Sequence, residues 1–254
     1  MVDGTEANAA ALARDYIEAA WANWRAQEAL ARPGAATGTP PLRLAPRFWF
    51  NPEVSSHHYL VPGSIALVLT LTGAMLTALV VARERERGTL EALLATPLTP
   101  GEFLAGKLLP YFLLGMLAAA LAVAVAVGPF GVPFRGSVAA LTGVSAVFML
   151  AALGQGLVIS VLSGGQLVAS QAAILTAFLP SLYFSGFVYE TEAMPWPLPL
   201  LSYLVPARYY VSSLQTLFLA GDVAAVLVPD MLAMAAIAAA LLALARWRLR
   251  ARVA

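Results

Sequence analysis

Long apolar stretches separated by short polar segments dominate the chain after about residue 59. A membrane-spanning helix needs about 20 mostly apolar residues, and five stretches reach that length: residues 60–82, 108–127, 138–162, 167–188 and 226–245. The first four carry no charged side chain, and the fifth carries only Asp230. This pattern predicts an all-α polytopic membrane protein with five transmembrane helices.

The first 59 residues follow a different pattern. Residues 5–30 have a helical period, with Leu12, Tyr16 and Trp24 on one broad face and charged side chains opposite. This helix either packs on an extracytoplasmic domain or lies on the membrane surface. Because so short a segment buries little core, we predict that residues 1–59 are part of a larger extracytoplasmic domain and that residues 60–254 form the transmembrane domain.

Five consecutive charges, residues 83–87, follow the first apolar stretch. One charge at the bilayer centre would cost about 2.5–3.5 kcal/mol, so this run lies in water. Lys and Arg gather in residues 83–107 and again after residue 245. The positive-inside rule therefore predicts that both segments are cytoplasmic and that the N-terminal segment is extracytoplasmic.

The loop that follows the charge run predicts two connected helices. Residues 88–97 form a short amphipathic helix that Pro97 ends. Thr99, Pro100 and Glu102 then form a capping box that opens the helix leading into the second span. Such an elbow can transmit a push from a cytoplasmic partner, although an ordinary solvated loop with well-made caps is the alternative.

Composition excludes several other functions. The chain is 60% hydrophobic and 11% charged, with a net charge of +1 and no cysteine, which argues against disordered chains, basic nucleic-acid binders and most soluble enzymes. Residues 101–107 match the GxxxxGK phosphate-loop pattern, but Leu108 stands where a Ser or Thr is required, and the segment enters a span. We therefore reject this match as an ATP site. His57 and His58 are adjacent, and neighbouring side chains on a helix or strand diverge, which argues against a paired metal site.

Polar side chains within the apolar stretches are hydroxyls and amides rather than ionisable groups, which disfavours a proton-driven transporter. We expect most of them to make interhelical contacts, with a substrate path as the alternative: Thr70, Thr72, Thr77, Gln155, Ser160, Ser170, Gln171, Thr176, Ser181 and Ser185. Residues 189–222 are too apolar for a free loop and too broken for a span. They predict half-helices that enter the membrane from outside, an extracytoplasmic re-entrant region.

Several segments together resemble the permease subunit of a type-2 ABC exporter of the multidrug-export branch. Residues 86–98 and 106–111 are similar to its cytoplasmic coupling segment, and residues 51–52 and 59–63 to its entry into a span. Ser185-Gly186-Phe187, Met194-Pro195 and residues 201–210 resemble its re-entrant region. The family also has an N-terminal span and a larger extracytoplasmic domain, and we expect this chain to lack that span and part of that domain.

The resemblance implies partners and site residues. In the family, two permease subunits pair, as a homo- or heterodimer, and each coupling helix docks on a separate ATP-binding subunit, which holds ATP and Mg. No cofactor is therefore expected in this chain, which would not be an enzyme itself, and no nucleic acid is expected as a partner. By position, residues that contact the ATPase would be Glu86, Arg87, Gly88, Thr89, Glu91, Leu94 and Pro97. The elbow would comprise Thr99, Pro100, Glu102 and Lys107, and the re-entrant exit region Ser185, Gly186, Met194, Pro195, Pro206 and Arg208.

The resulting hypothesis is a permease subunit of an ATP-driven exporter in the cytoplasmic (inner) membrane, moving a drug-like or amphipathic substrate outward. A non-transporting membrane assembly or scaffold protein, or a truncated permease remnant, is the main alternative. An intramembrane enzyme acting on lipid is a third, weakened by the lack of ionisable groups in the spans.

Overall fold

The computed structural model describes residues 2–3, 7–31, 48–49, 56–89, 100–188, 194 and 196–250. The chain forms two compact units, residues 1–59 and residues 60–254.

The first unit consists of one long helix and a minimal strand pair. Helix α1 (Ala7–Ala31) covers the predicted amphipathic segment, and strand β1 (Val2–Asp3) pairs in parallel with β2 (Phe48–Trp49). On α1, apolar side chains are between 44% and 75% exposed: Leu12, Tyr16, Ile17 and Trp24. Within the described residues, the apolar face of α1 is therefore uncovered.

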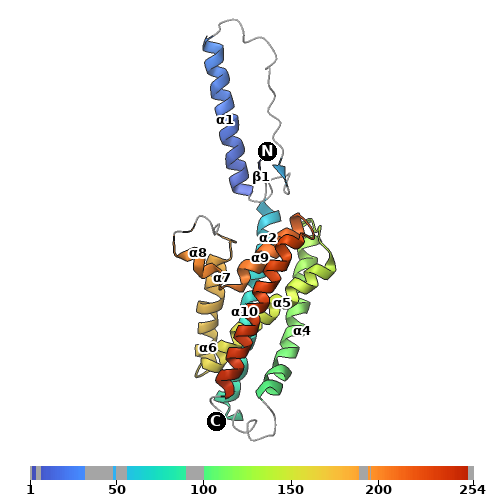
Figure 1. Cartoon of the computed structure of the whole chain (residues 1–254), viewed down its shortest axis with the longest axis vertical. Coiled ribbons are helices and arrows are strands. Elements are labelled where there is room, and N and C mark those ends of the chain that lie inside the picture. The colour runs from blue at the N-terminus through green and yellow to red at the C-terminus, as the bar shows by residue number, and fades with distance from the viewer. Residues whose placement is uncertain are drawn as a thin grey trace. The chain divides into compact units, whose positions relative to one another are not determined.

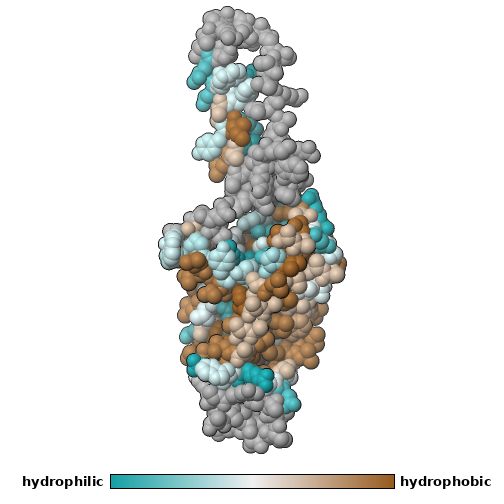
Figure 2. Space-filling view, viewed as in Figure 1, coloured by the Kyte–Doolittle hydropathy of each residue, from teal (hydrophilic) through white to brown (hydrophobic). Residues whose placement is uncertain are grey.

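The second unit is helical and contains five helices that are long and apolar enough to cross a membrane. They are α2 (Ser56–Glu86), α4 (Pro100–Val127), α5 (Val138–Leu162), the segment from α6 to α7 (Gln166–Phe184) and α10 (Ala224–Arg250) (Figure 1). Apolar side chains cover the visible face of this unit between its two ends (Figure 2). The prediction of an all-α polytopic membrane protein with five spanning helices is confirmed.

The fourth span is composite rather than one regular helix. It comprises α6 (Gln166–Ala173), the π-helical segment η2 (Ile174–Phe178) and α7 (Leu179–Phe184). Pro180 has no amide, so the carbonyl of Thr176, four residues earlier, lacks its usual helical donor. The side-chain amide of Gln155, on α5, donates to that carbonyl at 3.0 Å. The span ends at Phe184, not at the predicted residue 188, and Gly186 turns the chain there with a φ of 81°.

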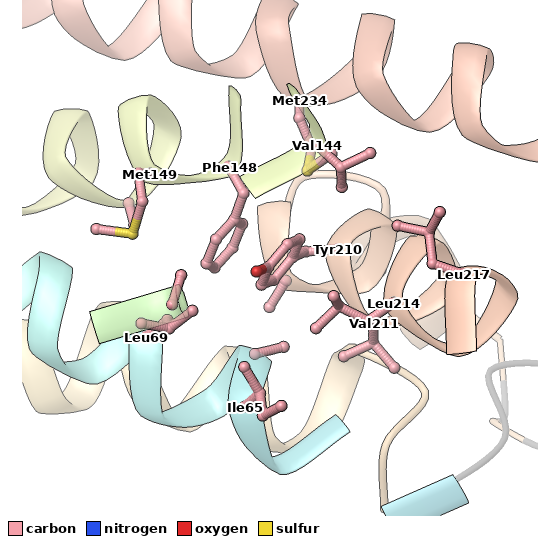
Figure 3. Close-up of a cluster of buried hydrophobic side chains, with 14 of the residues drawn as sticks. Ile65, Leu69, Val144, Phe148, Met149, Tyr210, Val211, Leu214, Leu217 and Met234 are labelled. Atoms are coloured by element: carbon pink, nitrogen blue, oxygen red, sulfur yellow. The ribbon is translucent and has the colours of Figure 1, made fainter. Parts of the chain in front are cut away.

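Two shorter helices follow, where the sequence predicted half-helices. They are α8 (Leu198–Ser202) and α9 (Pro206–Leu219). Helix α9 buries one face in the main core, where Tyr210 stacks on Phe148 of α5 with ring centroids 3.9 Å apart (Figure 3). The Tyr210 hydroxyl lies 2.9 Å from the hydroxyl of Ser145, so the buried phenol has a hydrogen-bond partner.

Helix α5 is the centre of the second unit, since it contacts α4, α6, α9 and α10 and also packs closely on α2. At the closest point, a Cβ added to Gly156 would lie 2.1 Å from the carbonyl oxygen of Ala74. The hydroxyl of Thr77 donates to the carbonyl of Leu153 at 2.9 Å in the same contact. Small residues allow two helix backbones to approach this closely within a membrane.

Candidate functional site

The charged end of α2 projects beyond the apolar part of the helix. The hydroxyl of Ser160, on α5, accepts hydrogen bonds from the backbone amides of Val81 and Ala82 at 2.8 and 3.0 Å. These amides lie inside α2, so a side chain of α5 enters the hydrogen-bond ladder of α2 just before the charges begin. Beyond Glu86 the chain leaves the helix, and Gly88 adopts a φ of 69° that favours glycine.

Arg85 binds the carboxyl end of α5. Its guanidinium donates to the carbonyl of Val161 at 3.2 Å and also to the carbonyl of Ser163. The last carbonyls of a helix lack partners within the helix and carry the negative end of its dipole. The Arg85 guanidinium therefore supplies donors to these carbonyls and a positive charge at the negative end of the dipole. It also joins the end of α2 to the end of α5.

Glu86 binds the amino end of α6 in the complementary way. Its carboxylate accepts a hydrogen bond from the backbone amide of Gln166 at 2.7 Å and another from the Gln166 side-chain amide. Gly165, the residue before α6, has no side chain to cap the helix, and a Cβ there would lie 2.5 Å from the Glu86 carboxylate. The cap of α6 is thus supplied by α2.

Glu84 joins α2 to α4. Its carboxylate lies 2.7 Å from the ammonium of Lys107. It also accepts a hydrogen bond from the Thr89 hydroxyl, which lies 3.2 Å from the Glu84 backbone carbonyl oxygen. Thr89 precedes residues 90–99 and Lys107 follows them. By binding both, Glu84 joins the two ends of this connection.

We call these residues the polar junction: Glu84, Arg85, Glu86, Thr89, Lys107 and Gln166. The Glu84–Lys107 ion pair is partly exposed, and ion pairs near the surface contribute only about 0–1 kcal/mol. The junction therefore matters more for how the helix ends are held together than for stability. It fixes the ends of α2, α4, α5 and α6 around a single loop. A force applied to that loop would therefore reach four helices together.

The remaining predicted coupling and elbow residues fall partly on this loop. Arg87 and Gly88 are exposed, and α4 begins at Pro100, with exposed Glu102 in its first turn, so the predicted helix start is confirmed. Four further predicted residues lie outside the described part of the chain: Glu91, Leu94, Pro97 and Thr99. The predicted short helix over residues 88–97 lies outside it for the same reason, apart from its first two residues.

The predicted exit residues lie around α7, α8 and α9. Pro206 is the buried first residue of α9, and the guanidinium of Arg208 lies 4.0 Å from the ring centroid of Tyr203 while it donates to the Ser202 hydroxyl. The Ser185 hydroxyl accepts a hydrogen bond from the amide of Phe187 at 3.3 Å. Gly186 makes the turn described above, Met194 is half-buried, and Pro195 lies outside the described residues.

The polar side chains of the spans make two main kinds of contact. Thr77, Gln155 and Ser160 make the interhelical contacts that we expected. Several others instead donate to carbonyls of their own helical segment: Thr70, Thr72, Ser170, Thr176 and Ser181. The expectation that most would join neighbouring helices was therefore too broad, because a hydroxyl in a helix reaches the carbonyl one turn earlier without any partner.

Sequence reasoning missed three of the junction residues, Glu84, Arg85 and Gln166. The charge run was visible, but apart from Thr89 its partners lie between 23 and 83 residues away. The one available signal was Gly164-Gly165 before an apolar helix, which marks a tight turn without a side-chain cap of its own.

Comparison with known families accounts for this architecture. A family model described as "ABC-2 family transporter protein" matches residues 2–247. The match spans the first four membrane helices, α10 up to residue 247, and every residue of the polar junction. The chain belongs to the ABC-2 transporter family. The family predicted from the sequence is thereby confirmed.

Curated relatives match most of this chain, which covers only part of their own length. "Probable multidrug ABC transporter permease YbhS" of Escherichia coli K12 is 45% identical over 91% of this chain and 61% of its own length. "Probable multidrug ABC transporter permease YbhR" of the same strain is 30% identical over 86% of this chain and 58% of its own length. "Inner membrane transport permease YhhJ", also of that strain, is 28% identical over 83% of this chain and 56% of its own length. The chain thus spans about three fifths of the length of these relatives.

Proposed function

We propose that this ABC-2 chain is the membrane-spanning permease part of an ATP-driven exporter that moves drug-like or amphipathic molecules out across the cytoplasmic membrane. The observation that carries the proposal is the polar junction, which joins the ends of α2, α4, α5 and α6 beside the connection between α2 and α4. Family membership supports it, as do the names of two relatives as probable multidrug permeases.

The energy would come from a separate ATP-binding subunit that holds ATP and Mg, and the permease would work as a dimer. We place the subunit contact on residues 87–97, including Arg87, Gly88, Thr89, Glu91, Leu94 and Pro97. Glu86 was predicted to share this contact, but its carboxylate already binds Gln166. In this proposal the subunit pushes on the loop, and the junction distributes the displacement over α2, α4, α5 and α6.

Orientation follows from charge. The junction and the arginines after residue 245 would face the cytoplasm, and the turn between α4 and α5 would face outward together with residues 1–59. Residues of the proposed exit region, around α8 and α9, would then lie near the outer surface. Trp196, which is 78% exposed there, is a residue type enriched at membrane interfaces.

The test is transport by purified components. The chain and its ATP-binding subunit would be reconstituted together into liposomes, with ethidium as the probe. We expect ATP-dependent movement of ethidium toward the side opposite the ATP-binding subunit, and none when the phosphate-loop lysine of that subunit is replaced. Transport that proceeds without the ATP-binding subunit would contradict the proposal, as would an assembled complex that hydrolyses ATP but moves none of a panel of amphipathic dyes.

A further inference from the structure

We propose that Glu86 is a positioning residue that makes α6 follow the end of α2 when the loop is displaced. The inference rests on the proposed function, because it assigns a path for the displacement rather than a new activity. It concerns an intramolecular contact, between the Glu86 carboxylate and the first residue of α6. Three features of α6 support it: its cap, its packing and its junction with α7.

The first feature is that the hydrogen bonds at the first residue of α6 are made with α2. Gln166 is the first residue of α6, and both its backbone amide and its side-chain amide donate to Glu86. The Gln166 side-chain oxygen in turn accepts from the guanidinium of Arg83 at 3.3 Å. Two consecutive turns of α2 therefore hold one residue of α6, and the bare Gly165 leaves room for the contact.

The second feature is that the rest of α6 packs on its neighbours through small side chains. Ala169 and Ala173 of α6, with Ala177 of η2, lie in one cluster with Ala74, Ala78 and Ala82 of α2 and Ile159 of α5. Alanine methyl groups allow close approach but interlock little, because they do not project between the residues of the facing helix. The directional contacts at Gln166 are therefore what sets the position of the α6 end along α2.

The third feature is that α6 is not continuous with α7. The π-helical η2 lies between them, and π-helical segments in α-helices occur frequently at functional sites. Pro180 removes one helical hydrogen bond here, and Gln155 of α5 takes its place at the Thr176 carbonyl. This leaves α6 attached to α2 at one end and to a proline-interrupted segment at the other, so that α6 can tilt without moving α7 by the same amount.

The experiment measures distances in the assembled complex. The chain has no native cysteine, so spin labels can be placed at exposed Leu76 on α2, Val168 on α6 and Tyr183 on α7. Distances between label pairs are recorded before and after the ATP-binding subunit is trapped with ATP and vanadate. In the wild type we expect the Leu76–Val168 distance to stay unchanged and the Val168–Tyr183 distance to shift.

Two variants remove the contact from opposite sides. Glu86→Ala deletes the acceptor, and Gln166→Pro deletes both donors. Proline is favoured at the first position of a helix, and the extended backbone of Gly165 (φ −165°, ψ 172°) suits a residue that precedes proline. In both variants we expect the Leu76–Val168 distance to broaden and to shift on trapping, with a several-fold loss of ethidium transported per ATP hydrolysed. Gln171→Ala, at an exposed glutamine of the same helix, is the matched control and should behave as the wild type.

The outcomes separate this inference from the proposed function. If the wild type shows the nucleotide-dependent shift and both variants retain wild-type distances and transport, Glu86 does not position α6 and the inference is overturned. If the wild type shows no nucleotide-dependent change in any pair, the proposed function fails first and the inference falls with it. Glu86→Gln keeps an oxygen that can accept from Gln166, so this variant should behave more like the wild type than Glu86→Ala does. If Glu86→Gln is as impaired as Glu86→Ala, the effect comes from the charge and not from the hydrogen bonds to α6, which would contradict the role assigned here.

Discussion

At the scale of single residues, the absence of a side chain at Gly156 sets how closely α2 and α5 approach. An added Cβ would lie 2.1 Å from the Ala74 carbonyl oxygen and 2.2 Å from the Thr77 hydroxyl, well inside contact distance. Neither group can give way easily, because one is backbone and the other already donates to the carbonyl of Leu153. Farther along the same two helices, Ser160 and Arg85 add polar bonds, so this contact continues to the polar junction.

We predict that Gly156→Ala lowers the thermal midpoint of the purified protein. Extra atoms in a close-packed contact cost about 1–3 kcal/mol, because the surrounding backbone must shift. Gly106→Ala is the matched control: it lies within α4, and a Cβ there would meet no atom within 4 Å. Alanine also favours helix over glycine by about 1 kcal/mol, so the control should hold or raise the midpoint. Size-exclusion chromatography of heated samples measures the thermal midpoint of each variant and of the wild type. A Gly156→Ala midpoint equal to that of the wild type would contradict the close α2–α5 contact.

At the scale of helices, the fourth span shows how one residue changes an element. Pro180 cannot donate to the Thr176 carbonyl, and an unpaired carbonyl is costly where no water is available. The structure meets this need with Gln155 from α5, at 3.0 Å, and with a π-helical segment before α7. Gln155 therefore replaces the hydrogen bond that Pro180 removes. The free energy that the interrupted helix costs depends on both residues.

We predict that Gln155 and Pro180 are energetically coupled. Gln155→Leu leaves the Thr176 carbonyl without its donor and should destabilise the protein by about 1 kcal/mol, the order measured for hydrogen bonds between membrane helices. Pro180→Ala restores a backbone amide that can donate to the same carbonyl. In the double variant the cost of Gln155→Leu should largely disappear. A double-mutant cycle on thermal midpoints measures this, and strictly additive effects would show that the two residues act independently.

The same span marks the limit of sequence reasoning. Long runs of apolar residues sufficed to predict five spanning helices, because length and hydropathy are properties of local sequence. Pro180 was visible within the fourth run and could have signalled the interruption, whereas its partner Gln155 could not be identified, since nothing local links the two. The contacts of the polar junction were missed for the same reason: the charges after Ala82 predicted a water-exposed segment, but not that Arg85 and Glu86 bind the ends of α5 and α6.

At the scale of the whole membrane unit, the exposed surface has the character that a bilayer requires. Helix α4 presents leucines spaced four residues apart, each between 57% and 61% exposed: Leu109, Leu113, Leu117 and Leu121. A continuous apolar stripe of this kind would be unfavourable in water and suits contact with lipid or with another membrane helix. Contacts made by charged side chains lie near the ends of α5 instead: the junction is at one end, and Asp222, which accepts from the amide of Ser137, is at the other.

This arrangement predicts which loops share a side of the membrane. The contact between Glu86 and Gln166 requires the segment after α2 and the turn before α6 to lie on the same side. From the concentration of basic residues after α2, we predict that this side is cytoplasmic. In the cysteine-free chain, Thr89→Cys and Gly164→Cys should react with a membrane-impermeant maleimide only after cells are permeabilised. Phe130→Cys, in the exposed turn after α4, should react in intact cells. Labelling of positions 89 and 164 from opposite sides would show that the junction does not form in the membrane, and labelling of position 89 from outside would remove the surface on which a cytoplasmic ATP-binding subunit could act.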